Sequence, residues 1–244
     1  MSQVTFYPLG NADCCLIKTT LGKTFVFDYA DMECPDDATD KRMPLKANFR
    51  ADIGWPNTKQ IDVLAITHGD NDHLKGVPDN FWLDHAEKYQ GSERVKINEL
   101  WVPAAILCEE GAEDDFRIVR QEARHRFLKK QGIRVFSRPE HLRDWVTSQD
   151  RRLEDFQDII TDAGRTVPGL TMEKDGIEFF VHSPFAERTA DGLLDRNGNC
   201  LVMQATFRES GVDTRFLITA DSVSANWRRM VKITREHNNE HRLA

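Results

Sequence analysis

Residues 67–76 have the sequence THGDNDHLKG, and this stretch decides how the chain is interpreted. Directly before it, residues 61–66 (IDVLAI) form an apolar run that predicts a buried strand. The following loop holds four side chains that can bind a metal ion: His68, Asp70, Asp72 and His73. Because side chains alternate along an extended chain, we expect three of the four to converge on one side of the strand end.

The types of side chain in this loop indicate which metal would bind. Imidazole nitrogen together with carboxylate oxygen suits zinc, manganese or iron better than calcium, which prefers oxygen ligands only. The alternative is an ordinary polar turn, because Gly, Asp and Asn all favour turns. Two histidines interleaved with two aspartates directly after an apolar strand favour the metal site.

The loop resembles the H-x-H-x-D-H motif of the metallo-β-lactamase superfamily, with Asp70 in place of the second histidine. The H-x-D-x-D-H variant is similar to that of the ComEC-like branch, which is named after the soluble domain of a DNA-uptake competence protein. Asp28, at the end of an apolar run, resembles an aspartate that orients the metal loop; the alternative is a residue that only caps its strand. Residues 197–203 and 215–222 resemble two later motifs, and Ala220 stands where glycine is usual.

The resemblance implies an α/β (α+β) fold of two β-sheets packed face to face, with helices on both outer faces. It implies two divalent ions, zinc or manganese, and the harder ligand Asp70 favours manganese. We expect one ion at His68 and Asp70, the other at Asp72 and His73, and Asp221 between the two. The catalytic residues would be Asp72 and His73, and two further side chains would support the ligands: Asp28 and Asn199.

The same resemblance implies a metal-dependent hydrolase, and first a phosphodiesterase or nuclease that acts on DNA or another nucleic acid. Two ions about 3.5–4 Å apart can activate water and clamp an in-line displacement at phosphorus. One alternative is hydrolysis of a small molecule on the same fold, such as a lactam, a thioester or a cyclic nucleotide. Another is a non-catalytic accessory protein with an incomplete site.

Composition sets limits on these hypotheses. The 244 residues are 40% hydrophobic and 30% charged, which is typical of a globular domain, and the net charge is −7. That charge argues against non-specific coating of nucleic acid, although bound metal ions add local positive charge. The chain has no signal pattern and no apolar run of membrane-spanning length. Its five cysteines form no C-x-x-C pair, so we expect reduced thiols and a cytoplasmic protein.

We expect a single domain over residues 1–244, truncated at its C-terminus, because no strand ending in a final histidine ligand follows Asp221. Residues 31–54 are expected to form a loop or insertion that rims the site, and residues 111–165 a mostly helical outer layer. Within that layer, the apolar spacing over Asp114–Gln131 predicts a helix, and Arg138–Ala163 predicts a second helical region.

Overall fold

The computed structural model describes residues 1–185 and 195–243. Within them, the larger sheet has seven strands in chain order: β1 (Gln3–Phe6), β2 (Cys15–Lys18), β3 (Thr24–Phe27), β4 (Gln60–Ala65), β5 (Lys96–Pro103), β6 (Ile133–Phe136) and β7 (Ile160–Thr161). The first three strands pair antiparallel, and every later pairing is parallel. The protein is therefore a mixed α/β structure around a mostly parallel sheet, in agreement with the predicted class.

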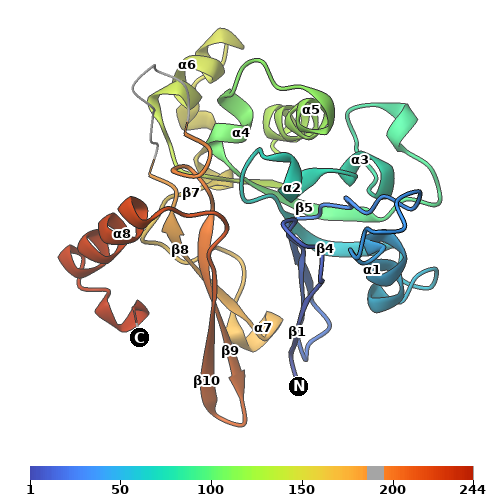
Figure 1. Ribbon diagram of the computed structural model, residues 1–244. Helices are drawn as coiled ribbons and strands as arrows, with labels where there is room; N and C mark the ends of the chain where they lie inside the picture. Colours follow the sequence, from blue (N-terminus) through green and yellow to red (C-terminus); the bar gives the residue numbers. More distant parts are fainter. Residues whose placement is uncertain (186–194, 244) are drawn as a thin grey trace.

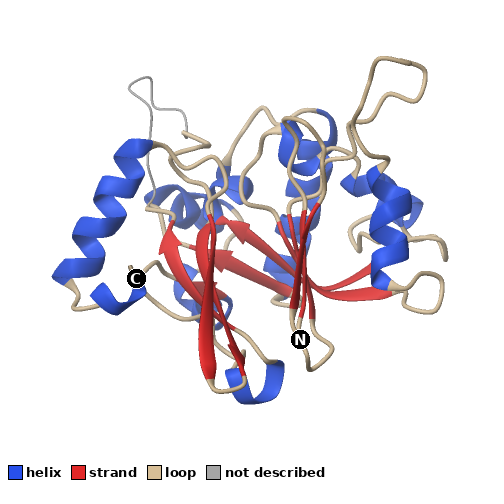
Figure 2. Ribbon diagram, turned by 60° about the horizontal axis from the view of Figure 1, so that its bottom comes forward, coloured by secondary structure: helices blue, strands red, loops and turns tan. Residues whose placement is uncertain are grey.

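A smaller antiparallel sheet packs against one face of the larger sheet (Figure 2). Its strands are β8 (Glu178–Ser183), β9 (Val202–Glu209) and β10 (Val212–Ile218), in the order β10-β9-β8. Aromatic rings fill the space between the sheets: the ring of Phe179 lies 5.0 Å from that of Phe25 and 5.3 Å from that of Trp101. This shared core fixes how the two sheets, and the loops at their ends, meet.

Helices cover the outer faces of both sheets (Figure 1). Over the larger sheet lie α1 (Leu45–Ile53), α2 (Asn71–Leu74), α3 (Val77–Asn80), α4 (Ala104–Cys108), α5 (Asp114–Lys129) and α6 (Glu140–Ser148). Met230 of α8 (Ser224–Glu236) packs on Cys200 and Val202 beside the smaller sheet. The remaining helical turns are short: Glu87–Tyr89, Leu153–Ile159, α7 (Met172–Asp175) and Glu240–Arg242.

The apolar run before the metal-ligand motif is confirmed as a strand, β4, and its packing explains its composition. Leu64 points into the core under the helices, whereas Val63 and Ala65 point into the core between the sheets. A strand that is buried on both faces needs apolar residues at successive positions, not at alternate ones. Strand β4 therefore lies inside the molecule, and the polar loop begins where it emerges.

Residues 111–165 contain the helices α5 and α6, a 3₁₀ helix and the strands β6 and β7. The helix expected over Asp114–Gln131 is α5, which ends at Lys129. The second helical region, Arg138–Ala163, is not one helix: α6 ends at Ser148, and Asp150 has a left-handed φ of 55° that breaks it. A 3₁₀ turn and the short strand β7 follow, and β7 extends the larger sheet.

Residues 32–44 contain neither helix nor strand, and α1 occupies most of what remains of the stretch 31–54. This stretch begins four residues after the end of β3, and the backbone N–H of Asp31 donates to the carbonyl of Lys75 at 2.9 Å. It therefore contacts the end of the ligand loop. Across the described part of the chain, none of the helices is both long enough and apolar enough to cross a bilayer.

Candidate metal centre

Asp28 joins the ends of β3 and β4 through hydrogen bonds to the first residue of the ligand motif. Its Oδ1 accepts from the backbone N–H of Thr67 at 2.7 Å, and its Oδ2 accepts from the Thr67 hydroxyl at 2.7 Å. Asp28 is buried and has a left-handed φ of 57°, a conformation that Asp tolerates better than most residues. The carboxylate is thus fixed beneath the loop.

The two histidines of the motif are both held through Nδ1. In His73, Nδ1 lies 2.8 Å from Oδ2 of Asp28. In His68, Nδ1 lies 3.1 Å from the hydroxyl of Thr67. The ring centroids are 4.0 Å apart, and Nε2 of His68 is buried without a hydrogen bond in the described structure. A histidine anchored through one ring nitrogen presents the other, so both residues offer Nε2 as a ligand atom.

Asp221 reaches the same place from the other sheet. It lies three residues after the end of β10, and its Oδ1 is 3.5 Å from Nε2 of His73. The ligand atoms of His68, His73 and Asp221 all lie within 4.8 Å of one another. His68 and Asp221 are 153 positions apart in the sequence and were predicted to share one site. The structure brings their side chains together.

Asp70 and Asp72 lie differently from the predicted arrangement. Oδ2 of Asp70 is 3.4 Å from Nε2 of His68, but its Oδ1 accepts a 2.6 Å hydrogen bond from Arg196. Both neighbours hold the pKa of Asp70 well below its usual range, the His68 ring more strongly, although burial opposes them. Asp72 is half-buried at the start of α2 and belongs to neither group of clustered ligands among the described residues.

Asp13 is a site residue that the sequence reasoning did not single out. Together with Asp28 and His73 it forms a second group whose ligand atoms lie within 4.8 Å of one another. Its backbone N–H donates to the carbonyl of Asp72 at 2.9 Å, which ties the turn before β2 to the ligand loop. Burial raises the pKa of Asp13; His73 lowers it, and three neighbouring carboxylates raise it again. The signal for Asp13 in the sequence was its position in the turn just before the second strand.

The carboxylates around His73 also set its protonation. Burial by itself lowers the pKa of His73, but the hydrogen bond to Asp28 and the nearby negative charges outweigh it and raise the pKa to about 9. At neutral pH the ring is therefore protonated in the absence of a bound cation. A metal ion that binds at Nε2 must displace this proton, so binding would release it.

Asn199, predicted to support the ligands, is buried in the turn before β9. Its side-chain N–H donates to the carbonyl of Asp195 at 2.7 Å. This turn brings the backbone N–H of Leu201 to within 2.9 Å of the carbonyl of Thr67. Asn199 thus stabilises the turn through which the second sheet contacts the ligand loop.

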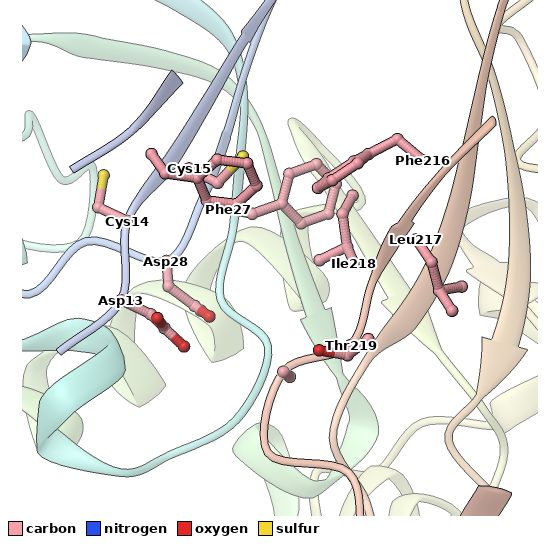
Figure 3. A pocket seen from close by; sticks show the side chains of 11 residues that line it. Asp13, Cys14, Cys15, Phe27, Asp28, Phe216, Leu217, Ile218 and Thr219 are labelled. Atoms are coloured by element: carbon pink, nitrogen blue, oxygen red, sulfur yellow. The ribbon is translucent and has the colours of Figure 1, made fainter. Parts of the chain in front are cut away.

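A cavity of about 130 Å³ opens beside Asp13 and Asp28 (Figure 3). The carboxylates of these two residues lie on one side of it, and strand β10 forms the opposite wall with Phe216 and Ile218. The rings of Phe216 and Phe6 lie 5.5 Å apart, and Phe6 is 62% exposed. The lining continues through Thr219 and Ala220, next to Asp221, so the cavity is adjacent to the clustered ligands.

His182 is a useful contrast to His68. It is also buried, and its Nε2 also lacks a hydrogen bond in the described structure. Its surroundings are different: the ring contacts Phe180, and burial and the charge of Arg242 lower its pKa to about 4. Neither group of clustered ligands includes it. Burial of an unpartnered nitrogen is therefore not enough to define the site; carboxylates must surround it.

Comparison of the sequence with protein-family models and with curated proteins found no match.

Proposed function

We propose that the protein is a metal-dependent hydrolase with an αββα architecture like that of the metallo-β-lactamase superfamily. Two sheets packed face to face with helices outside both support this proposal, as does the position of the site where the loops after β4 and β10 meet. One observation carries most of the argument. Both imidazoles are fixed through Nδ1 and face Asp221, while Nε2 of His68 is buried without a hydrogen bond in the described structure.

These donors fit a divalent transition metal. Two imidazole nitrogens and one carboxylate oxygen suit zinc or manganese, and a carboxylate that holds the far nitrogen of a ligand histidine is a common supporting contact. When bound, such an ion polarises a water molecule or a substrate oxygen. A second ion would take Asp70 and Asp72 as ligands.

The protein's own residues supply orientation and proton transfer. Asp28 holds His73 in the orientation that directs Nε2 toward Asp221, which is itself 44% exposed and open to a substrate. The carboxylate of Asp72 forms no hydrogen bond within residues 1–185 and 195–243, and we propose it as the acceptor of a proton from the attacking water. His73 is the other proposed catalytic residue, through the position of its Nε2.

A nucleic acid is the preferred substrate. The exposed ring of Phe6 beside Phe216 offers a surface on which a base can stack, and such stacking is worth roughly 1–3 kcal/mol per base. The carboxylates along the same cavity would repel a phosphate. Cleavage of a phosphodiester here therefore requires bound cations, and we expect no activity without them.

The size of the cavity favours a second candidate, hydrolysis of a compact molecule. Its volume is about 130 Å³, and an engineered cavity of roughly 150 Å³ is known to hold one benzene ring. A lactam, a thioester or a cyclic nucleotide would present its scissile bond near Asp221 with one ring in the cavity. The cavity opens to solvent, so a longer chain such as a nucleic acid can also enter it.

We propose a reducing compartment, the cytoplasm, because the described residues contain no disulfide bond and Cys34 is exposed.

The test compares His68→Gln and Asp221→Asn with the matched control His182→Gln, which changes an equally buried histidine outside the site. Metal content would be measured by mass spectrometry. Hydrolysis of DNA, RNA, a small phosphodiester and a lactam would be followed with added manganese or zinc. We expect the two site variants to lose metal and activity and the control to keep both.

Equal metal content in the wild type and all three variants would contradict the proposal. Metal binding without hydrolysis of any substrate would instead support the non-catalytic alternative.

A further inference from the structure

Arg196 is a cation that the structure places directly at the candidate centre. It follows the turn residue Asp195, and its guanidinium lies between two carboxylates from distant parts of the chain. Its Nη1 donates to Oδ1 of Asp70 at 2.6 Å, and its Nε donates to the carboxylate of Glu109 at 2.9 and 3.1 Å. The guanidinium also lies over the ring of Phe116, 5.0 Å from its centroid. These contacts hold it in one orientation.

Asp70 is the residue that departs from the more common histidine of the motif, and its two oxygens are used differently. Oδ1 is taken by Arg196, and Oδ2 faces Nε2 of His68 at 3.4 Å. The ligand atoms of His68, His73 and Asp221 cluster together without Asp70. The negative charge of Asp70 is thus balanced by a guanidinium on one side, while the buried Nε2 of His68 lies 3.4 Å away on the other without a hydrogen bond.

A metal ion and the guanidinium of Arg196 cannot both bind Asp70 without electrostatic repulsion between them. A divalent ion bound to Asp70 lies close to the guanidinium, and like charges at such distances repel strongly in a partly buried site. Glu109 keeps Arg196 nearby, so a second ion must draw Asp70 away from it. An ion at His68, His73 and Asp221 does not require this exchange.

We propose that Arg196, anchored by Glu109, occupies the second cation position at Asp70, so that the centre binds one ion strongly and a second only in competition with the guanidinium. This inference rests on the proposed metal centre. It makes Arg196 a positioning residue that sets the number of bound ions, and it explains why an aspartate is tolerated at position 70.

The test is calorimetric titration of the full chain with Mn²⁺ alone, in wild type and Arg196→Met. Wild type is expected to bind one ion strongly and a second weakly or not at all. In Arg196→Met the second ion should bind more tightly by about tenfold to a hundredfold, the worth of a charged hydrogen bond, with the first little changed. Electron paramagnetic resonance should then show two coupled Mn²⁺ ions in the variant, a signal that a merely structural role of Arg196 would not produce.

Two further variants make the result independent of folding. Glu109→Gln weakens the anchor and should strengthen the second site in the same direction but less. Arg208→Met removes an arginine from an exposed ion pair with Asp213 on the β9–β10 hairpin and should change neither site.

Two equally strong sites in wild type would overturn the inference, as would a single site in both Arg196→Met and Glu109→Gln. Either result leaves the proposed function standing. Binding of no ion by any of the proteins would overturn the proposed function, and this inference with it.

Discussion

Two partly buried clusters of charged side chains differ in how their polar atoms are used. In the Glu122 cluster (Glu122, Arg126, Asp84 and His85), the carboxylate of Glu122 accepts from the backbone of Asp84 and His85, from the His85 ring and from Arg126, at 2.6–3.0 Å. In the His68 cluster (His68, His73, Asp28 and Asp221), the buried Nε2 of His68 makes no hydrogen bond within the described residues, and Oδ2 of Asp70 lies 3.4 Å from it.

This difference separates a structural cluster from a candidate functional one. Buried polar groups are normally paired, because an unpaired one loses its bonds to water without replacement. The Glu122 cluster follows this rule and needs nothing further. In the His68 cluster the ligand atoms of His68, His73 and Asp221 face one another within 4.8 Å, which is an arrangement that a cation would complete by displacing the proton of His73.

Removing the charge of Glu122 should cost the most stability. Glu122→Gln leaves the buried guanidinium of Arg126 without its nearest carboxylate, and breaking one side of a buried ion pair costs about 3–5 kcal/mol. The free energy of unfolding would be measured by urea denaturation at pH 7. His68→Gln is the matched variant and should cost about 1 kcal/mol in metal-free protein, since the hydrogen bond that it removes is the uncharged one between Nδ1 and the Thr67 hydroxyl. Equal losses would remove the distinction between the clusters.

The stabilisation of the fold by the Glu122 cluster should also decrease in acid. Burial raises the pKa of Glu122, but its bonds to His85 and Arg126 outweigh this and lower the pKa from 4.5 to about 2. The stabilisation, roughly 3 kcal/mol, is therefore fully present above pH 4.5 and lost as the pH falls toward 2. Urea denaturation of wild type and Glu122→Gln across this range should show their difference shrinking. A difference that is independent of pH would contradict the assignment.

Metal should stabilise the folded protein through the His68 cluster only. At a metal concentration about 100 times the dissociation constant, binding adds roughly 2.7 kcal/mol to the free energy of unfolding. Thermal unfolding with added Mn²⁺ or Zn²⁺ should shift upward in wild type and in Glu122→Gln, and a chelator should reverse the shift. The same shift in His68→Gln would show that the metal binds elsewhere.

Asp28→Asn should weaken metal binding without abolishing it. The amide can still contact Thr67, but it no longer favours the ring orientation and charge that Asp28 gives to His73. Loss of such a supporting carboxylate typically lowers metal affinity by about 10- to 100-fold. Titration calorimetry would measure the change. Asp31→Asn is the control, because Asp31 accepts from the backbone of Leu45 and lies outside both ligand groups.

The smallest effect concerns Ala220, next to the candidate ligand Asp221. Ala220 has a left-handed φ of 45°, a conformation that glycine adopts without strain. Ala220→Gly should relieve this strain but add freedom to the unfolded chain, for a net stabilisation of about 0.5 kcal/mol. Urea denaturation would measure it. A loss of stability would show that packing of the Ala220 methyl group stabilises the fold.

Much of the site could be predicted from local sequence patterns, whereas contacts between distant residues could not. His68 and His73 follow an apolar strand at close spacing, so their convergence could be inferred from the chain alone. Asp28 and Asp221 required the resemblance, because an aspartate after a strand is a weak signal. The contacts of Arg196 with Asp70 and Glu109 could not be inferred, since they join residues 126 and 87 positions apart without any local pattern.

The same limit applies to the fold. A strand that is buried on both faces, such as β4, can be predicted from its continuous run of apolar residues. The sequence predicts a helical region after α6 because Leu153, Phe156 and Ile159 have helical spacing. In the structure these residues lie in a 3₁₀ helix that leads into β7, the edge strand of the larger sheet. Spacing alone does not show where a residue with left-handed φ, here Asp150, will end a helix.

The most direct measurement is an anomalous difference map from crystals of the full chain grown with Mn²⁺. We expect a peak within bonding distance of His68 Nε2, His73 Nε2 and the carboxylate of Asp221. A map with no peak at these three atoms, from crystals in which manganese is bound elsewhere or not at all, would refute the proposed metal centre.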